Sequence, residues 1–379
     1  MNMNKAIVIG SDAVNALGLV QSLGREGVDV TAILECEKSE LIRHSNYAKE
    51  IIPVGNFEEA VEVLLTRFAG EEKIPVFPAG DGVALILAQN YERLEKHFLI
   101  EHSTGPYTIE QLMNKELQIE LAIKHKFNVP YSVCISKPFC VPETMVYPCI
   151  VKPLVSCLGD KRDILIAQNT EELKDILENR VTFSDSVIIQ QFIQRDYEYC
   201  MMGCAFKNGH VYIPLTDRPV KFNHKLQDTS YINYIEPVAG EIAGEIAKIE
   251  AFMKEVKYVG LFSVEFMHDK NRNTLYFTEI NFRNDGTNSF IVHCGVNLPY
   301  LHYQDLLDLP HKIYTPINKT KKYIWEGIHF SNLINKGISF REWLSDLKGI
   351  DGFLYYFKDD KAPFFYQFAN KILRKFHLS

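Results

Sequence analysis

Val259–Gly286 reads VGLFSVEFMHDKNRNTLYFTEINFRNDG, and this stretch is the most informative part of the chain. Two apolar runs flank a polar segment near Asn271–Asn273, which predicts two antiparallel strands joined by a turn. Side chains two positions apart on a strand point to the same face. We therefore expect Glu279, Asn281 and Arg283 to share a face, and folding about the turn brings Glu265 opposite Glu279.

The predicted face suits a divalent cation. Adjacent carboxylates repel one another unless a cation lies between them, and a small set of hard oxygen ligands favours Mg²⁺, with Mn²⁺ as a substitute. Arg283, two residues beyond the last ligand, is placed to reach charge that develops on a transferred group. The alternative interpretation is a surface hairpin whose acidic side chains are only solvated.

Four other segments precede this hairpin in a recognisable order. Asn114-Lys115 opens a helical stretch, Lys152 lies in the strand-like run YPCIVKP, and the run VIIQQFI is followed by Glu198. With the hairpin, these segments resemble the ATP-grasp superfamily over residues 7–310. The resemblance is closest to its carboxylate–amine ligases, the carbamoyl-phosphate-synthase-like branch that includes D-aspartate ligases.

The resemblance implies a role for each matching residue. The metal ligands would be Glu265, Glu279 and Asn281, and Arg283 would be the catalytic residue. The implied ATP-binding residues are Lys115, Lys152, Ser156, Gly159, Gln190, Gln191, Phe192, Ile193 and Glu198. The loop VSCLGDKRD has fewer glycines than many relatives, and the two glutamines replace the glutamates that are common at the adenine hinge.

A basic loop within TDRPVKFNHK is a further candidate. Arg218 and Lys221, with His224, would bind a substrate carboxylate or an acyl phosphate there. A solvated loop explains the same residues equally well.

Alternating strand and helix patterns predict an α/β fold with a doubly wound parallel sheet up to about residue 104. The expected divisions are an N-terminal α/β domain at 1–105, a small ATP-grasp subdomain with its linking helix at 106–195, and a large subdomain with the metal site at 196–312. Residues 313–379 form a C-terminal extension. Both subdomains are expected to be α+β units that hold nucleotide between them. In such enzymes the first domain often holds the acceptor substrate, so AGDG at Ala79–Gly82 is expected to line that site.

Composition limits the classes of partner. A net charge of −7 without a basic block argues against nucleic acid as a partner. The eight cysteines show no paired CxxC spacing and no signal peptide precedes Lys5, so we expect core thiols in a reducing cytoplasm. No apolar run is long enough to span a bilayer. The amphipathic end, FFYQFANKILRKF, predicts a packed terminal helix, with contact to a membrane or partner as the alternative.

Together these features predict an ATP- and Mg²⁺-dependent ligase. It would activate a small carboxylate as an acyl phosphate and join it to an amine, with an amino acid as the leading candidate, or to a thiol; a homo-oligomer is compatible with this function. Two other classes remain open: a catalytically silent nucleotide-binding protein and a dinucleotide-dependent oxidoreductase. Gly10 and Gly18 imitate the glycine fingerprint of the latter only loosely, because Asp12 and Ala13 break it.

Overall fold

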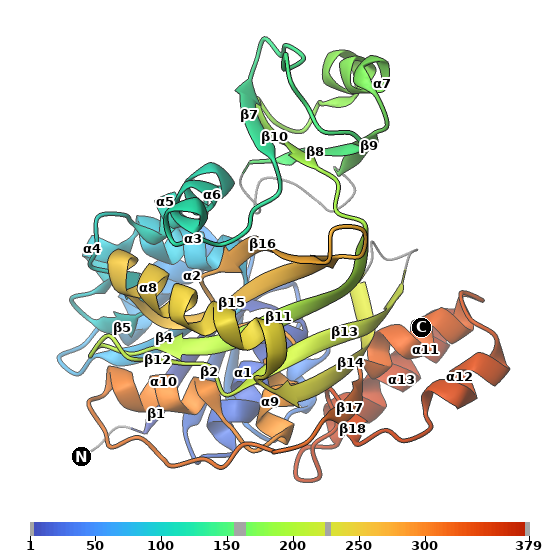
Figure 1. The fold of residues 1–379 in the computed structure, drawn as a ribbon. Coiled ribbons are helices and arrows are strands. Elements are labelled where there is room, and N and C mark those ends of the chain that lie inside the picture. Colours follow the sequence, from blue (N-terminus) through green and yellow to red (C-terminus); the bar gives the residue numbers. More distant parts are fainter. Residues whose placement is uncertain (1–3, 155–163, 224–228, 376–379) are drawn as a thin grey trace.

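The computed structural model describes residues 4–154, 164–223 and 229–375, which form three β-sheets with helices packed against them (Figure 1). A small unit built around β7–β10 stands apart from the rest of the molecule, above the strands β16, β15 and β11 (Figure 1). Ser156, Gly159 and His224 lie outside the described residues, so their predicted roles stay predictions.

The N-terminal sheet is parallel and has the strand order β3-β2-β1-β4-β5. Alternate residues of β1 enter different cores: Ala6 and Val8 pack toward α1, while Ile7 and Ile9 pack with residues of α2 and α3 on the opposite face. Helices thus cover both faces, which confirms the predicted doubly wound sheet. Its elements are β1 Lys5–Ser11, α1 Val14–Gly24, β2 Asp29–Glu35, β3 Ala48–Val54, α2 Phe57–Val63, β4 Ile74–Pro78, α3 Asp81–Gln89, α4 Tyr91–Leu94 and β5 Phe98–Ile100.

Two short helices connect this sheet to the small unit. Thr108 and Gln111 form a capping box at the start of α5, and Asn114 caps α6 by accepting from the amides of Glu116 and Leu117. The small unit is an antiparallel sheet of order β7-β10-β8-β9 with α7 over one face. These elements are β6 His102–Ser103, α5 Ile109–Leu112, α6 Lys115–Lys124, β7 Ser132–Ser136, β8 Cys149–Pro153, β9 Leu165–Ala167, α7 Thr170–Asp175 and β10 Ser186–Gln191.

The largest sheet places the hairpin of interest at its edge. Its main path runs β16-β15-β11-β13-β14-β17-β18. Along β11, Met201 packs into the core beneath α8, and Met202 packs into the core shared with α1 and α10. The elements of this part are β11 Arg195–Ala205, β12 Val211–Tyr212, β13 Leu215–Asn223, β14 Thr229–Pro237, α8 Ile246–Val256, β15 Tyr258–Asp269, β16 Thr274–Asn281, α9 Asn288–His293 and α10 Leu298–Leu306.

One sequence-based expectation was wrong for this sheet. The expected basic loop is not a loop at Arg218 and Lys221, since both residues lie within β13 and pair with β14 across irregular register positions.

The C-terminal segment extends the same sheet. β17 Lys321–Ile324 pairs with β14, and β18 Gly352–Phe353 pairs with β17. The helices α11 Glu326–Ile334, α12 Phe340–Asp346 and α13 Ala362–Lys375 complete the segment, at the right of Figure 1. The domain boundary at residue 312 stays a prediction, although strands on both sides of it share one sheet.

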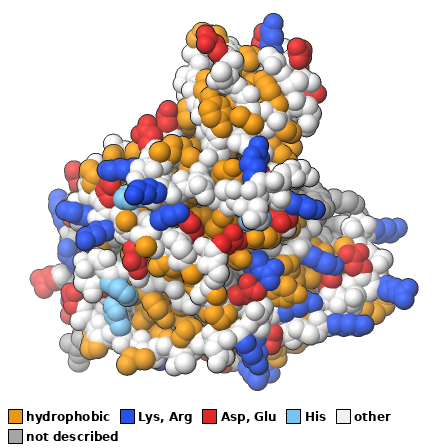
Figure 2. Space-filling model, in the orientation of Figure 1, with side chains coloured by type: hydrophobic (Ala, Val, Ile, Leu, Met, Phe, Trp, Pro, Cys, Tyr) orange, Lys and Arg blue, Asp and Glu red, His pale blue; other side chains and the backbone are white. Residues whose placement is uncertain are grey.

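Helix α13 packs against the rest of the protein, in agreement with the prediction of a packed terminal helix. It contacts α11 and the short 3-10 turn Ile42–His44, while Phe365 and Ile372 on its outer side are exposed. Among the described residues, no helix is both long and apolar enough to cross a bilayer. Figure 2 shows acidic and basic side chains interspersed over one face of the molecule.

Candidate active site

The edge hairpin β15–β16 brings the predicted ligands together. In its register Glu265 pairs with Glu279 and Ser263 pairs with Asn281. The Asn281 side-chain amide donates to Glu265 Oε1 at 3.1 Å and to Ser263 Oγ at 3.3 Å. Glu265, Glu279 and Asn281 therefore meet on one face, as their spacing predicted; their role as metal ligands stays a prediction.

A β-bulge sets this register. Phe266 pairs with Phe277 and Glu265 with Glu279, so Thr278 is an extra residue, and its hydroxyl donates to the Glu265 carbonyl. The apolar side chains of β16 change parity at this point: Leu275 and Phe277 enter the same core as Ile280. That change of parity is visible in the sequence, and it is the signal that would have predicted the bulge.

Two lysines from other elements approach the acidic face. Lys115, the first residue of α6, places Nζ 3.0 Å from Glu279 Oε2. Lys152 on β8 is partly buried, and its pKa is lowered to about 7 by this burial and then by the positive charge of Lys115. The structure thus brings Lys115, Lys152 and Glu279 into one cluster, although they come from three separate segments.

The two glutamates respond to this cluster in opposite ways. Lys115 is the main cause that lowers the pKa of Glu279 below its usual range. Burial raises the pKa of Glu265 well above its usual range, and the carboxylates of Glu279 and Asp285 add to that effect. A buried carboxylate surrounded by other acidic groups is stabilised by a cation, so the electrostatics of Glu265 fit a metal ligand.

The donor set also fits magnesium. Among the described residues, no group of three or more His, Cys, Asp and Glu side chains could hold a metal ion. A metal at the hairpin would thus have Glu265, Glu279 and the Asn281 amide oxygen, and its remaining ligands would be water or phosphate. In nucleotide sites Mg²⁺ typically has few protein oxygen ligands, and phosphate oxygens complete its coordination.

Helix α6 is held against the hairpin by a residue that sequence reasoning missed. The buried Gln118 side chain accepts from the Ile280 amide at 2.9 Å and donates to the Ile280 carbonyl at 2.9 Å. Ile280 separates the two predicted ligands on β16. Gln118 thereby fixes Lys115, one turn earlier on its helix, relative to Glu279. A single polar residue at a packing position of α6 was the only sequence signal for this contact.

The predicted adenine hinge connects β10 with β11. The Gln190 side chain donates to Ser132 Oγ, and the backbone amides of Gln191 and Phe192 donate to Tyr131 and Pro148. Among the described residues, the amide of Ile193 has no acceptor, so it is the hinge amide available to a ligand. Farther along, Glu198 pairs with Arg195 and lines a pocket together with Glu265.

Arg218 and Lys221 already have carboxylate partners. Arg218 forms a two-point ion pair with Glu236 at 2.8 and 3.0 Å. Lys221 binds Asp346 at 2.5 Å and Glu342 at 3.2 Å, both on α12. The structure does not bring either residue into the cluster of Lys115, Lys152 and Glu279, so their predicted binding of substrate is not supported by proximity.

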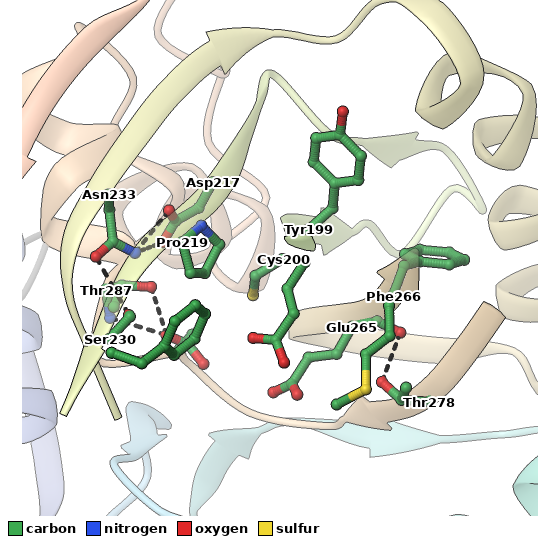
Figure 3. Close-up of a pocket in the computed structure, with 14 residues that line it drawn as sticks. Tyr199, Cys200, Asp217, Pro219, Ser230, Asn233, Glu265, Phe266, Thr278 and Thr287 are labelled. Carbon is green, nitrogen blue, oxygen red and sulfur yellow. Dashed lines mark hydrogen bonds between the residues drawn. The ribbon is translucent and has the colours of Figure 1, made fainter. Parts of the chain in front are cut away.

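A pocket opens beside Glu265 (Figure 3). Asp217 lies in its wall, and Asn233 donates to both oxygens of this carboxylate at 2.8 and 2.9 Å. Burial is the main reason that the pKa of Asp217 is raised to about 7. Asp285 lines the same pocket. Asp217 and Asn233 were missed because they are 16 residues apart and meet only through the pairing of β13 with β14.

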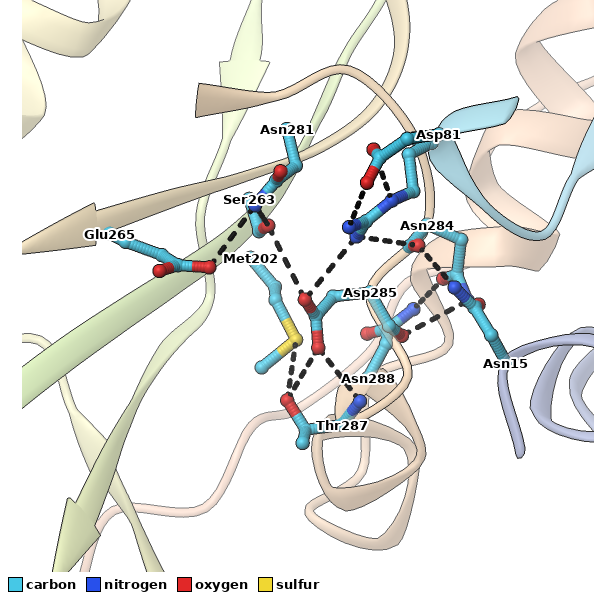
Figure 4. A network of polar contacts seen from close by, with 11 residues as sticks. Asn15, Asp81, Met202, Ser263, Glu265, Asn281, Asn284, Asp285, Thr287 and Asn288 are labelled. Carbon is cyan, nitrogen blue, oxygen red and sulfur yellow. Dashed lines mark hydrogen bonds and ion pairs between the residues drawn. The ribbon is translucent and has the colours of Figure 1, made fainter. Parts of the chain in front are cut away.

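Arg283 lies just beyond β16 and contacts α3 of the N-terminal unit. Its Nε and Nη2 donate to the two oxygens of Asp81 at 2.9 and 3.2 Å, and Nη1 lies 3.5 Å from Asp285 (Figure 4). Asp81 belongs to the AGDG segment, which the sequence had associated with an acceptor site. The two segments meet although they are separated by 202 residues.

The turn between β1 and α1 argues against a dinucleotide site. Both carboxylate oxygens of Asp12 accept backbone amides of residues 40–42, so a negative charge occupies the turn where a pyrophosphate would bind. Gly10 has a packing role, because a Cβ there would lie 2.7 Å from the Ala79 Cβ. The oxidoreductase alternative therefore loses the feature that suggested it.

Comparison with known proteins agrees with this arrangement. Residues 120–294 match the model of the ATP-grasp domain. The chain is 21% identical to the D-aspartate ligase of Enterococcus faecium over 356 residues, which cover 85% of this chain and 82% of that protein. It is 29% identical to the formate-dependent phosphoribosylglycinamide formyltransferase of Pelobacter propionicus over 170 residues, 43% of this chain and only 41% of that protein.

Solved structures share the fold. The N5-carboxyaminoimidazole synthetase of Staphylococcus aureus superposes with a TM-score of 0.68 at 16% identity, covering 98% of this chain and 97% of its own. The L-amino acid ligase of Bacillus licheniformis superposes with a TM-score of 0.61 at 16% identity, covering 84% and 76%. The predicted resemblance and fold class are confirmed: residues 120–294 form an ATP-grasp domain, and the N5-carboxyaminoimidazole synthetase of Staphylococcus aureus shares the fold of the whole chain.

Proposed function

We propose that the protein uses ATP to activate a small carboxylate as an acyl phosphate and joins it to the amino group of an amino acid. One observation carries the proposal: Glu265, Glu279 and Asn281 share a face of the edge hairpin, and Lys115 approaches it from another element. This arrangement provides opposite charges for phosphates and for the cation that accompanies them.

Each group has a proposed task. Lys115 and Lys152 bind phosphate oxygens from two sides, the Ile193 amide meets the adenine edge, and Glu198 binds the ribose. Glu265, Glu279 and Asn281 hold Mg²⁺, which neutralises phosphate charge when bound. Arg283, beyond the last ligand, stabilises charge on the transferred group.

The reaction is group transfer in two steps. A substrate carboxylate oxygen bonds to the γ-phosphorus as the bond to ADP breaks. The amino group, after its ammonium proton has passed to solvent, then bonds to the acyl carbon; the bond from that carbon to the phosphate oxygen breaks, and a second N–H proton leaves with the phosphate. Positioning and charge stabilisation account for most of the catalysis of phosphoryl transfer, so no side-chain nucleophile is required.

The choice of an amino acid rests on two supports. A D-aspartate ligase is matched over most of both chains, and an L-amino acid ligase shares the fold. The pocket beside Glu265 has Asp217 and Asp285 in its wall, and such oxygen acceptors suit an amino group.

Phosphate release, measured with ATP and Mg²⁺ over a panel of amino acids paired with small carboxylates, tests the proposal. We expect one pair to stimulate release, and Glu279→Gln to lower the rate about 100-fold or more because a shared ligand is lost. Glu255→Gln is the matched control, since Glu255 also pairs with a lysine of α6, Lys124, but on the far end of that helix.

Full activity of a folded Glu279→Gln protein would refute the assignment of the site. ATP binding without phosphate release for any pair would instead favour a silent nucleotide-binding protein.

A further inference from the structure

The guanidinium of Arg283 is held from one side. Asp81 accepts from Nε at 2.9 Å and from Nη2 at 3.2 Å, a two-point bond along one edge of the planar group. Arg283 is largely buried, and the carboxylates of Asp81 and Asp285 raise its pKa further against the effect of burial. Because the group is planar, two bonds along one edge fix the direction of the opposite edge.

The opposite edge is only loosely engaged. Nη1 lies 3.3 Å from the Asn284 carbonyl and 3.5 Å from Asp285 Oδ2, which are long for hydrogen bonds. Among the described residues, Asp81 is the only acceptor for Nη2, which has two N–H groups. The guanidinium therefore retains N–H groups that can receive an oxyanion.

A second pair of hydrogen bonds connects the same segment to α1 of the N-terminal unit. Asn15 donates to the Asn284 carbonyl at 2.9 Å, and Asn284 donates to Asn15 Oδ1 at 2.6 Å (Figure 4). The backbone beside Arg283 is thus positioned without Asp81. The bond from Asp81 adds the orientation of the side chain itself.

We propose that Asp81 is a positioning residue that orients the Arg283 guanidinium toward the transferred phosphoryl group. The N-terminal unit would then complete the reaction centre by holding a catalytic group, beyond any role in holding the acceptor. This inference rests on the proposed function, because it assigns the open edge of Arg283 to the phosphoryl group.

Two competing roles make different predictions. If Asp81 binds the acceptor amine directly, its loss raises the KM for the amine and leaves phosphoryl stabilisation intact. If Asp81 only helps to dock the N-terminal unit, its loss lowers stability and weakens all ligands alike.

The test compares two nucleotide complexes by calorimetry, with Mg²⁺ present. The first is a non-hydrolysable ATP analogue, which reports ground-state binding. The second is ADP with fluoroaluminate, a planar mimic of the phosphoryl group in transfer. We expect Asp81→Asn to change the affinity for the ATP analogue by about twofold or less and to weaken the affinity for ADP with fluoroaluminate about 10-fold or more. Asp81→Glu, which retains the carboxylate, should recover part of the loss.

A double-mutant cycle shows whether Asp81 acts through Arg283. In an Arg283→Lys background, which lacks the planar fork, Asp81→Asn should cause little further loss of fluoroaluminate affinity. Asp359→Asn is the control. Asp359 forms an ion pair with Arg25, so it also connects a later segment to the N-terminal unit, but in another part of the molecule. The control should leave both affinities unchanged.

Three results would overturn the inference. Equal weakening of both complexes by Asp81→Asn indicates a docking role, and unchanged fluoroaluminate affinity with a raised amine KM indicates acceptor binding. Failure of the wild-type protein to bind either complex refutes the nucleotide site and the inference with it. Binding of both complexes without phosphate release for any substrate pair would refute only the ligase proposal.

Discussion

Lys115 and Glu279 neutralise each other at a distance of 3.0 Å. Each is proposed to bind a different part of Mg²⁺–ATP, so binding replaces one internal ion pair by two new ones, lysine with phosphate and glutamate with cation. Because Lys115 is the main cause of the low pKa of Glu279, it also keeps that carboxylate ionised and ready for a metal.

At the residue scale, Lys115→Met should weaken binding of Mg²⁺ and a non-hydrolysable ATP analogue about 10- to 100-fold, the range expected for a lost charge-assisted hydrogen bond. Calorimetry gives the affinity. Lys124→Met is a matched control on the same helix, because Lys124 also pairs with a glutamate but is largely exposed. Equal affinities for both variants and the wild type would remove Lys115 from the site.

At the scale of elements, the hairpin β15–β16 could be predicted from the sequence, but its β-bulge was missed. The turn and the pairing of Glu265 with Glu279 follow from the alternation of apolar and polar residues. The extra residue Thr278 is indicated only by the spacing of the buried side chains: Phe277 and Ile280 enter the same core although they are three residues apart, whereas a regular strand would bury every second residue.

Long-range contacts limit what sequence alone can predict about the site. Lys115 and Lys152 were assigned to the site only because the order of their segments resembles that of a known family. The partners of Arg218 and Lys221 come from β14 and α12, so these ion pairs form only in the tertiary fold. Asp81 meets Arg283 across 202 residues, and no local pattern encodes such a contact.

Gln118 provides a test of how α6 is fixed to β16. Gln118→Met keeps a similar volume but leaves the buried Ile280 amide and carbonyl without their side-chain partner, so we expect a loss of about 2–4 kcal/mol in unfolding free energy. Weaker nucleotide binding should accompany the loss, because Lys115 and Glu279 are no longer held together. Urea denaturation measures the stability.

Gln89→Leu is the control, since the Gln89 side chain is exposed and bonds to Glu110 at the surface. Its stability should change by about 0.5 kcal/mol or less. A Gln118→Met protein as stable as this control would show that α6 is fixed by apolar packing alone.

At the scale of the whole molecule, buried acids join the units to one another. Glu101 follows β5 and accepts from the Leu261 amide of β15 at 3.1 Å, facing the Tyr258 hydroxyl and His302. Burial raises the pKa of Glu101 to about 8, and its bond from Leu261 only partly opposes that rise. Asp360 makes a similar connection for the C-terminal segment by accepting from Gln21, Ser45 and Asn46.

The raised pKa of Glu101 makes stability depend on pH. Between its usual pKa near 4.5 and its folded value of about 8, the folded protein retains a proton that the unfolded chain has lost. The stability that this group contributes is therefore complete below about pH 4.5 and is lost as the pH rises to 8. Glu101→Gln removes the titration, so its unfolding free energy relative to the wild type should increase from pH 5 to pH 8. Parallel urea titrations measure the difference, and a constant difference would contradict the prediction.

The strands β17 and β18 give the end of the chain a role in the assembly of the central sheet. β17 covers the edge of β14, whose backbone would otherwise offer unpaired amides and carbonyls to any neighbouring strand, and β18 pairs in turn with β17. A shortened version ending near Pro310, where the resemblance to the family stops, would leave that edge open to self-association. Fragments designed for expression or fusion should therefore retain the C-terminal extension, although it lies outside the part of the chain that carries the family signature.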